Sequence, residues 1–141
     1  MGMTIHVDVV CADREIYSGT SEMVIAPAEM GEVGIMPGHS PFITRMTPGE
    51  VRVQHEGREE EVVFVSGGYL EVQPSVVTIL ADTAERAPDI DVAEAEAAKR
   101  RAEQALEERT SDMEVAQAKA ELLEATARLR VYRRHRERSG V

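Results

Sequence analysis

The stretch that decides the fold of the first half lies at residues 51–65 and reads VRVQHEGREEEVVFV. Val51 and Val53 alternate with polar residues, which is the period of a β-strand that buries one face. Gly57 then marks a turn, because glycine adopts the backbone conformations of tight hairpins at little steric cost. Residues 62–65 are all apolar, so we expect the returning strand to be covered on both faces. The stretch therefore predicts a β-hairpin.

The rest of the first 88 residues follows the same pattern. Alternating apolar runs begin near Ile5 and near Leu70, and turn signals separate the runs by about 8–12 residues. The further turn signals are Met30-Gly31, Pro37-Gly38, Pro48-Gly49, Gly67-Gly68 and Pro74-Ser75. Short, evenly spaced strands with no helix between them indicate an antiparallel β-sandwich or barrel.

The composition changes at Pro88. All six prolines lie at or before this residue, and only Gly140 of the ten glycines follows it. The second half therefore lacks turn signals and favours helix. Asp91 stands before a long unbroken run, with Glu94 three residues later, which is a variant of the capping box. We expect this helix to end near Arg109.

A second helix is predicted from Ser111, which forms a capping box with Glu114. The apolar positions of the first helix are Ala95, Ala98, Ala102, Ala105 and Leu106, and those of the second are Val115, Ala118, Leu122, Ala125, Leu129 and Tyr132. This spacing is typical of helices that pack on each other, and a short connection makes them antiparallel neighbours. Because most of these side chains are single methyl groups, which bury little area, we expect a labile hairpin.

The sequence thus predicts an α+β protein, with β-structure first and helices second. An antiparallel β-sandwich is expected over residues 1–88, and an antiparallel two-helix hairpin is expected over residues 89–141. The interpretation of the second part as a regulatory element depends on the resemblance described below.

Composition excludes several classes of function. The chain has 141 residues, a formal net charge of −10 and one cysteine, Cys11. An acidic protein is a poor ligand for nucleic acid, and one cysteine cannot form an internal disulfide. No apolar run approaches the roughly 20 residues of a membrane-spanning helix, and the start lacks the pattern of a signal peptide. We expect a soluble protein from a reducing compartment, with no nucleic-acid partner and no direct membrane insertion.

No pattern in the sequence predicts catalysis. The four histidines share no metal-ligand spacing, so neither a metal site nor a cofactor is expected. Ser66 precedes two glycines, but the motif of a nucleophile elbow is missing and a hairpin turn explains these residues better. The acidic residues 59–61 alternate between the two faces of a strand. They therefore predict charged side chains exposed to solvent at the edge of a sheet and not an acid/base pair. We therefore expect a protein without catalytic residues of its own.

Two other features remain open to two interpretations. Residues 31–41 form a dense turn cluster, either an ordinary connection or a rigid loop shaped for a partner. The second feature is a basic helix end, consisting of Arg128, Arg130, Arg133, Arg134, Arg136 and Arg138. In one interpretation these arginines belong to a frayed, solvent-exposed helix end, where the helix dipole favours cations. In the other they bind an acidic protein surface.

Several blocks of the sequence carry a resemblance to a known family. Residues 32–41 read EVGIMPGHSP, residues 65–72 read VSGGYLEV, and residues 80–84 read LADTA. Together with AQA at 116–118 and ARLRV at 127–131, they closely resemble the epsilon subunits of bacterial F-type ATP synthases. The resemblance covers residues 3–132. It implies a β-sandwich and a helical hairpin, in agreement with the patterns above.

The resemblance also implies a function. Subunits of this family sit on the rotating central stalk, bind the gamma subunit and the membrane-embedded c-type ring, and help to couple proton flow to ATP synthesis. Their hairpin can extend into the alpha/beta catalytic head and inhibit ATP hydrolysis. By this resemblance the chain is a peripheral protein of the cytoplasmic face of the bacterial inner membrane.

The resemblance assigns residues to these contacts. The ring-facing loop of the family corresponds to Glu29, Met30, Gly31 and Glu32, and the histidine on its gamma side corresponds to His39. For the extended state we expect Arg128, Arg130, Arg133 and Arg134 to face acidic residues of the catalytic head.

An alternative function is a small nucleotide sensor that closes its hairpin over ATP. Some relatives bind ATP through an Ile/Leu-Asp-x-x-Arg-Ala motif, which here corresponds to residues 90–95. Glu94 stands at the arginine position, which exchanges a cation for an anion and argues against tight binding. Asp91 and Arg128 remain as a candidate weak ATP site. A β-sandwich enzyme and a coiled-coil adaptor are further alternatives, but the first lacks a polar cluster and the second leaves the loop at 31–41 unexplained.

Overall fold

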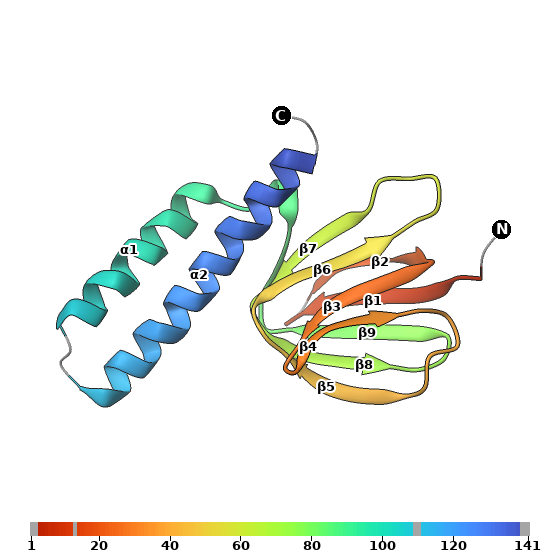
Figure 1. Cartoon of the computed structure of the whole chain (residues 1–141), viewed down its shortest axis with the longest axis horizontal. Coiled ribbons are helices and arrows are strands. Elements are labelled where there is room, and N and C mark those ends of the chain that lie inside the picture. Colours follow the sequence, from red (N-terminus) through yellow and green to blue (C-terminus); the bar gives the residue numbers. More distant parts are fainter. Residues whose placement is uncertain (1–2, 13, 109–110, 139–141) are drawn as a thin grey trace. The chain divides into compact units, whose positions relative to one another are not determined.

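The computed structural model describes residues 3–12, 14–108 and 111–138. It divides into two compact units, Met1–Arg86 and Ala87–Val141. The first unit holds all ten β-strands of the described chain, and the second holds the helices (Figure 1).

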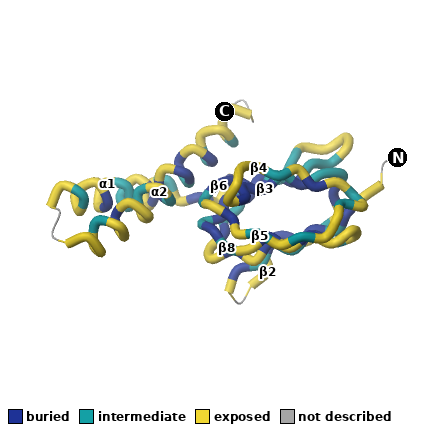
Figure 2. Tube along the Cα trace, turned by 60° about the horizontal axis from the view of Figure 1, so that its bottom comes forward, coloured by how far each residue is buried: buried dark blue, intermediate teal, exposed yellow. Residues whose placement is uncertain are grey.

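The first unit is a sandwich of two layers (Figures 1 and 2). One layer contains β10 (Ala84–Arg86), β7 (Glu61–Val65), β6 (Gly49–Gln54), β3 (Met23–Ala28) and β4 (Gly31–Ile35). The other contains β5 (Phe42–Met46), β8 (Gly68–Val72), β9 (Val76–Ala81), β1 (Ile5–Cys11) and β2 (Arg14–Ser21). A single residue pair, Ala28 with Met46, continues the hydrogen-bonded path from one layer to the other. The predicted β-sandwich is therefore confirmed.

Two details of the sandwich go beyond the prediction. β1 and β9 pair in parallel, whereas the other strand pairs of the described sheet are antiparallel. A parallel pair needs a long connection, and here the chain passes through both layers between the two strands. At the far edge, Arg86 Nε donates a hydrogen bond to the carbonyl oxygen of Ile16 at 3.3 Å, which joins β10 to β2.

The core of the sandwich follows from the alternation in its strands. In β1 every second residue from Ile5 to Cys11 is buried, and the residues between them are partly exposed. The predicted hairpin at 51–65 forms between β6 and β7, with Val51 opposite Val63. All four apolar residues at 62–65 are buried, as expected for a strand covered on both faces.

The second unit is a helical hairpin preceded by a short 3₁₀ turn, η1 (Ala87–Asp89). Helix α1 (Val92–Glu108) begins where the Asp91 carboxylate accepts a hydrogen bond from the Glu94 N–H at 3.0 Å. Helix α2 (Asp112–Arg138) begins likewise, with the Ser111 hydroxyl accepting from the Glu114 N–H at 3.1 Å. The bond from the helix N–H to the cap side chain is therefore confirmed for both predicted capping boxes. The predicted end of the first helix at Arg109 lies outside the described residues.

The seam between the helices agrees with the prediction only in part. The buried residues are Ala95 and Ala102 of α1 and Ala118, Ala125, Ala127, Leu129 and Val131 of α2. Ala105 is exposed, so its assignment to the seam was wrong. At about 100° per residue it lies about 80° away from Ala95, whereas half-buried Leu106 lies about 20° away. Ala127 and Val131 form a second buried stripe on α2. Helix α2 also contacts η1.

In the part of the chain that the structure describes, no helix combines the length and the apolar character that crossing a membrane requires.

Candidate partner-binding sites

The predicted ring-facing residues lie on the β3–β4 hairpin. Its tip carries Met30, whose side chain is 99% exposed and therefore packs against almost nothing in the chain. At the base of the turn, the Glu29 N–H donates a hydrogen bond to the Arg45 carbonyl oxygen at 2.9 Å. The next residues, Gly31 and Glu32, pair with Ala28 and Pro27 of β3. The hairpin thus presents one large apolar side chain to solvent between two acidic residues.

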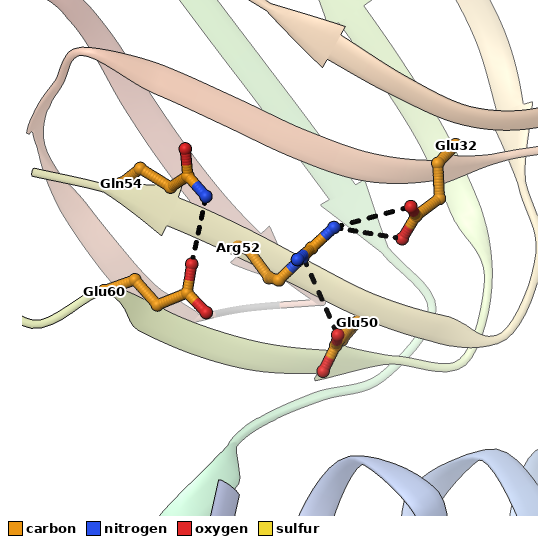
Figure 3. Close-up of polar contacts among 5 residues, drawn as sticks. All are labelled: Glu32, Glu50, Arg52, Gln54 and Glu60. Atoms are coloured by element: carbon orange, nitrogen blue, oxygen red, sulfur yellow. Dashed lines mark hydrogen bonds and ion pairs between the residues drawn. The ribbon is translucent and has the colours of Figure 1, made fainter. Parts of the chain in front are cut away.

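A polar network adjoins this hairpin (Figure 3). Arg52 Nη2 lies 3.4 Å from both carboxylate oxygens of Glu32. On its other side, Arg52 Nε lies 3.7 Å from Glu50 Oε1, and the Glu50 side chain is only 4% exposed. Farther along β6, Gln54 Nε2 donates to Glu60 Oε2 at 3.2 Å. One guanidinium therefore stands between a buried carboxylate and the exposed Glu32.

His39 lies in the connection from β4 to β5. Its backbone N–H donates to the Met36 carbonyl oxygen at 3.1 Å, and its ring Nδ1 lies 2.8 Å from the Ser40 carbonyl oxygen. The ring centroid is 5.2 Å from that of Phe42. The neighbouring Gly38 N–H donates to the Pro74 carbonyl oxygen at 2.8 Å, which ties the loop to the β8–β9 turn. The loop is therefore held by one backbone hydrogen bond within it and by one to the neighbouring β8–β9 turn.

The structure separates Met30 from His39. Met30 precedes the first residue of β4, and His39 follows the last, so the two lie beyond opposite ends of the same strand. A strand of five residues is about 17 Å long. The residues that the resemblance assigned to partner contact thus form two separate places on the sandwich.

An apolar surface that the sequence analysis did not identify lies on the outer face of the second layer. Tyr69 of β8 stands beside Arg45 of β5 and Leu80 of β9, and the Arg45 guanidinium lies 5.8 Å from the centre of the Tyr69 ring. Tyr69, Leu80 and Ile43 are all large, apolar and 45–65% exposed. We call Ile43, Tyr69 and Leu80 the outer apolar patch. The sequence could have indicated this patch, because each of the three residues lies at an outward-facing position of a strand whose inward-facing positions are also apolar.

A Ser–His–Asp cluster lies on the same outer face. Ser18 Oγ donates to Asp8 Oδ1 at 2.7 Å, His6 Nε2 lies 2.9 Å from the same oxygen, and Ser18 Oγ is 3.3 Å from His6 Nε2. The hydrogen bond from Ser18, followed by the contact with His6, holds the pKa of Asp8 below its ordinary value although partial burial opposes this. In a catalytic triad the imidazole lies between the hydroxyl and the carboxylate. Here both groups meet one carboxylate oxygen, so the cluster does not activate a nucleophile.

The hairpin contains a cavity of about 260 Å³ between its helices. It is lined by Glu94, Ala98, Arg101, Glu121, Glu124, Ala125 and Arg128. Arg101 Nη2 lies 3.5 Å from Glu94 Oε1, so the carboxylate that replaces the family's arginine forms a solvent-exposed ion pair with another residue of the cavity lining. Of the two candidate ATP residues, Arg128 lines the cavity, whereas Asp91 caps α1. Three carboxylates against two guanidiniums make this cavity unfavourable for a polyphosphate.

The four predicted inhibitory arginines do not share one face of α2. Arg130, Arg133 and Arg134 are exposed and follow helical spacing along one side. Arg128 is half-buried and lies about 160° from Arg130, on the opposite side of the helix. The structure therefore groups three of the four, and it places Arg128 with the cavity.

The described residues contain no group of three or more His, Cys, Asp and Glu side chains placed to hold a metal ion. The chain carries an exposed turn, a braced loop, an apolar sheet face and a basic helix end, which are features typical of a protein that binds other proteins.

Comparisons with known proteins give the family. The family model of the ATP synthase delta/epsilon chain beta-sandwich domain matches residues 4–87, and that of its long alpha-helix domain matches residues 89–133. An ATP synthase epsilon chain of Nitrosococcus oceani is 60% identical over 140 residues, which is 99% of this chain and 100% of the relative. One from Thioalkalivibrio sulfidiphilus is 60% identical over 96% of this chain and 99% of its own. The chain therefore belongs to the family of ATP synthase epsilon chains, which confirms the resemblance.

A solved structure shares the fold. A chain in the cryo-EM structure of the Euglena gracilis mitochondrial ATP synthase, OSCP/F1/c-ring in rotational state 1, aligns with a TM-score of 0.77 and 21% identity. The alignment covers 88% of this chain and 78% of that chain.

Proposed function

We propose that this chain is a non-catalytic subunit of the central stalk of a bacterial F-type ATP synthase, where it helps to couple proton flow to ATP synthesis. The observation that carries the proposal is the full-length similarity to curated epsilon chains, at 60% identity across both units. The fold supports the same function, because a rotor element transmits torque through broad packing and the sandwich has a dense, continuous apolar core.

The outer apolar patch is the surface proposed for the gamma subunit. Monomeric proteins seldom expose several large apolar side chains side by side, and such a group marks an interaction site. The patch has the composition of an interface centre, with one aromatic residue and two aliphatic residues flanked by Arg45 and Glu71. His39 and its braced loop add a second, separate contact on the gamma side.

The tip of the β3–β4 hairpin is the surface proposed for the membrane-embedded c-type ring. Met30 offers a flexible apolar contact, and Glu29 and Glu32 offer carboxylates beside it. Membrane attachment then occurs through partners, at the cytoplasmic face of the bacterial inner membrane.

The helical hairpin is proposed to regulate the enzyme. Its seam is lined mainly by alanine, so little apolar area holds the two helices together and an extended state is accessible. In the extended state Arg130, Arg133 and Arg134 contact acidic residues of the alpha/beta catalytic head and inhibit ATP hydrolysis. The charge complementarity of a basic helix end and an acidic surface favours this contact.

Reconstitution of the synthase tests the proposal. The remaining subunits are assembled with the full chain, with residues 1–88 only, or without the chain, and proton-driven synthesis and ATP hydrolysis are measured separately. We expect coupling to require the sandwich, and inhibition of hydrolysis to require the hairpin as well. A complex that assembles and couples equally well without the chain contradicts the proposal.

A further inference from the structure

We propose that Arg52 is a positioning residue that holds Glu32, and through it the Met30 turn, in one conformation. The proposal deepens the assignment of this turn to ring contact and rests on it for its consequence in the complex. The network itself is visible in Figure 3.

The β3–β4 hairpin needs such a support because β4 is an edge strand. Within the described sheet, β4 pairs only with β3, and its five residues include two glycines. Short edge strands with exposed backbone open more readily than central strands. Beyond the edge strand, the tip residue Met30 is 99% exposed and contributes almost no packing of its own.

Arg52 reaches the edge strand from the far side of β3. Ile25 of β3 pairs with Arg52 of β6 on one side and with Gly34 of β4 on the other. The Arg52 side chain crosses this strand and places Nη2 3.4 Å from both oxygens of Glu32. The contact therefore links three strands, β6, β3 and β4, by a side chain where β4 has no further backbone pair in the described sheet.

Glu50 attracts the opposite side of the Arg52 guanidinium. The Glu50 carboxylate is 4% exposed and lies 3.7 Å from Arg52 Nε, while Arg52 itself is 22% exposed. At this distance Arg52 Nε makes no hydrogen bond to Glu50, so Glu50 attracts that side of the planar guanidinium as an ion pair, while Nη2 on the other side faces Glu32. A lysine at this position offers a single point of contact and would not bridge both carboxylates in the same way.

The turn then has two anchors, one at each side of Met30. The Glu29 N–H bond to the Arg45 carbonyl oxygen fixes the side that follows β3. The Glu32–Arg52 contact fixes the side that opens β4. A side-chain substitution can remove only the Glu32–Arg52 contact, because the other anchor is a bond between backbone groups.

Amide hydrogen exchange on the full chain tests the positioning role. In Arg52→Gln we expect the amides of residues 31–34 to exchange roughly two- to fivefold faster, as befits the loss of a partly exposed ion pair. Glu32→Gln, at an exposed position that tolerates the change, is expected to show the same local effect. The double variant is expected to exchange no faster than Arg52→Gln, because Arg52→Gln already removes the contact that Glu32→Gln removes. Arg14→Gln, at the exposed start of β2, is the matched control and leaves these amides unchanged.

Three outcomes overturn the proposal. The first is wild-type exchange at residues 31–34 in both single variants. The second is a uniform increase across the sandwich, which indicates a general structural role. The third is an additive double variant, which shows that Arg52 does not act through Glu32.

A second measurement separates this proposal from the function of the turn. Binding of each variant to detergent-solubilised membrane rings with the gamma subunit is compared with that of Met30→Ala. Weaker binding of Arg52→Gln, by roughly two- to fivefold, alongside faster local exchange supports both proposals. Faster exchange with unchanged binding of all variants supports the positioning role and contradicts the ring contact of the turn.

Discussion

Gly68 approaches Ala81 so closely that a side chain on the glycine would collide with the neighbouring strand. A Cβ atom at Gly68 would lie 2.9 Å from the Ala81 Cα and would overlap the carbonyl oxygen of Leu80. The φ angle of Gly68 is also positive, at +124°. Both β8 and β9 are central strands, so the backbone has little freedom to move apart.

Gly68→Ala is therefore expected to destabilise the sandwich by roughly 3 kcal/mol, from backbone strain and overpacking together. The measurement is the free energy of unfolding in urea. Gly57→Ala is the matched control, because Gly57 also has positive φ, at +76°, but has no atom within 4 Å of the added Cβ. Its expected cost is only about 1 kcal/mol. Equal costs for the two variants would show that the close approach to β9 contributes nothing.

The sequence predicted the turn at Gly67-Gly68 but not this contact. A turn signal is local, whereas the approach of Gly68 to Ala81 depends on the pairing of two strands. The same limit explains the parallel pairing of β1 with β9, since alternation gives the faces of a strand and not its neighbour. The misassigned Ala105 has a different cause, because a helical stripe drifts around a straight helix and favours Leu106 at that turn.

For the candidate sites too, the sequence predicted individual residues but not which of them lie close together. Met30, Glu32 and His39 were assigned through the family resemblance, which names a ring side and a gamma side but gives no distance. The separation of Met30 and His39 by the length of β4 came only from the structure. The outer apolar patch needed the register of three strands before Ile43, Tyr69 and Leu80 became neighbours. Arg52 gave no signal at all, because its partner Glu32 lies on a strand that is not adjacent to its own.

The outer apolar patch gives a prediction for partner binding. Tyr69→Ala and Leu80→Ala are each expected to weaken binding to the purified gamma subunit by roughly tenfold, since large apolar side chains at the centre of an interface carry most of its energy. Both side chains are at least 45% exposed, so the free energy of unfolding should change little. Isothermal titration calorimetry measures the affinity. Thr20→Ala, at an exposed position on β2 outside the patch, serves as the control, and affinities that match it would exclude the patch.

The Ser–His–Asp cluster of Ser18, His6 and Asp8 gives a prediction for pH dependence. A carboxyl with a depressed pKa in the folded state adds stability above its ordinary value of 3.8, and this stability is lost as the pH falls through the folded pKa. Ser18→Ala removes the largest cause of the depression, so the pKa of Asp8 should rise toward 3.8. Carboxyl chemical shifts measured by NMR across pH 2–6 give this pKa directly. We also expect the variant to be less stable than the parent at neutral pH, with the difference shrinking at lower pH, and a constant difference would contradict this account.

The hairpin cavity gives a prediction for nucleotide binding. Because Glu94 pairs with Arg101 and two more carboxylates line the cavity, ATP should bind weakly, with no saturation at low-micromolar concentrations. Glu94→Gln removes one anion and releases Arg101, and the affinity should rise roughly three- to tenfold. Equilibrium titration by calorimetry measures both proteins, with Glu103→Gln as the control because this exposed residue of α1 is not part of the cavity lining. Low-micromolar affinity in the unmodified chain would instead favour the nucleotide sensor.

The basic end of α2 gives a prediction for inhibition. Arg130, Arg133 and Arg134 lie along one side of the helix, so one acidic surface can meet all three at once, whereas Arg128 lies about 160° away from Arg130. In the assembled enzyme, alanine at all three positions should raise ATP hydrolysis roughly two- to fivefold through the loss of this contact. Arg128→Ala alone should leave hydrolysis unchanged, because a helix cannot present opposite sides to one flat surface. Equal relief by the single and the triple variant would mean that the extended helix is surrounded by acidic residues, and unchanged hydrolysis in the triple variant would exclude the arginines from the inhibitory contact.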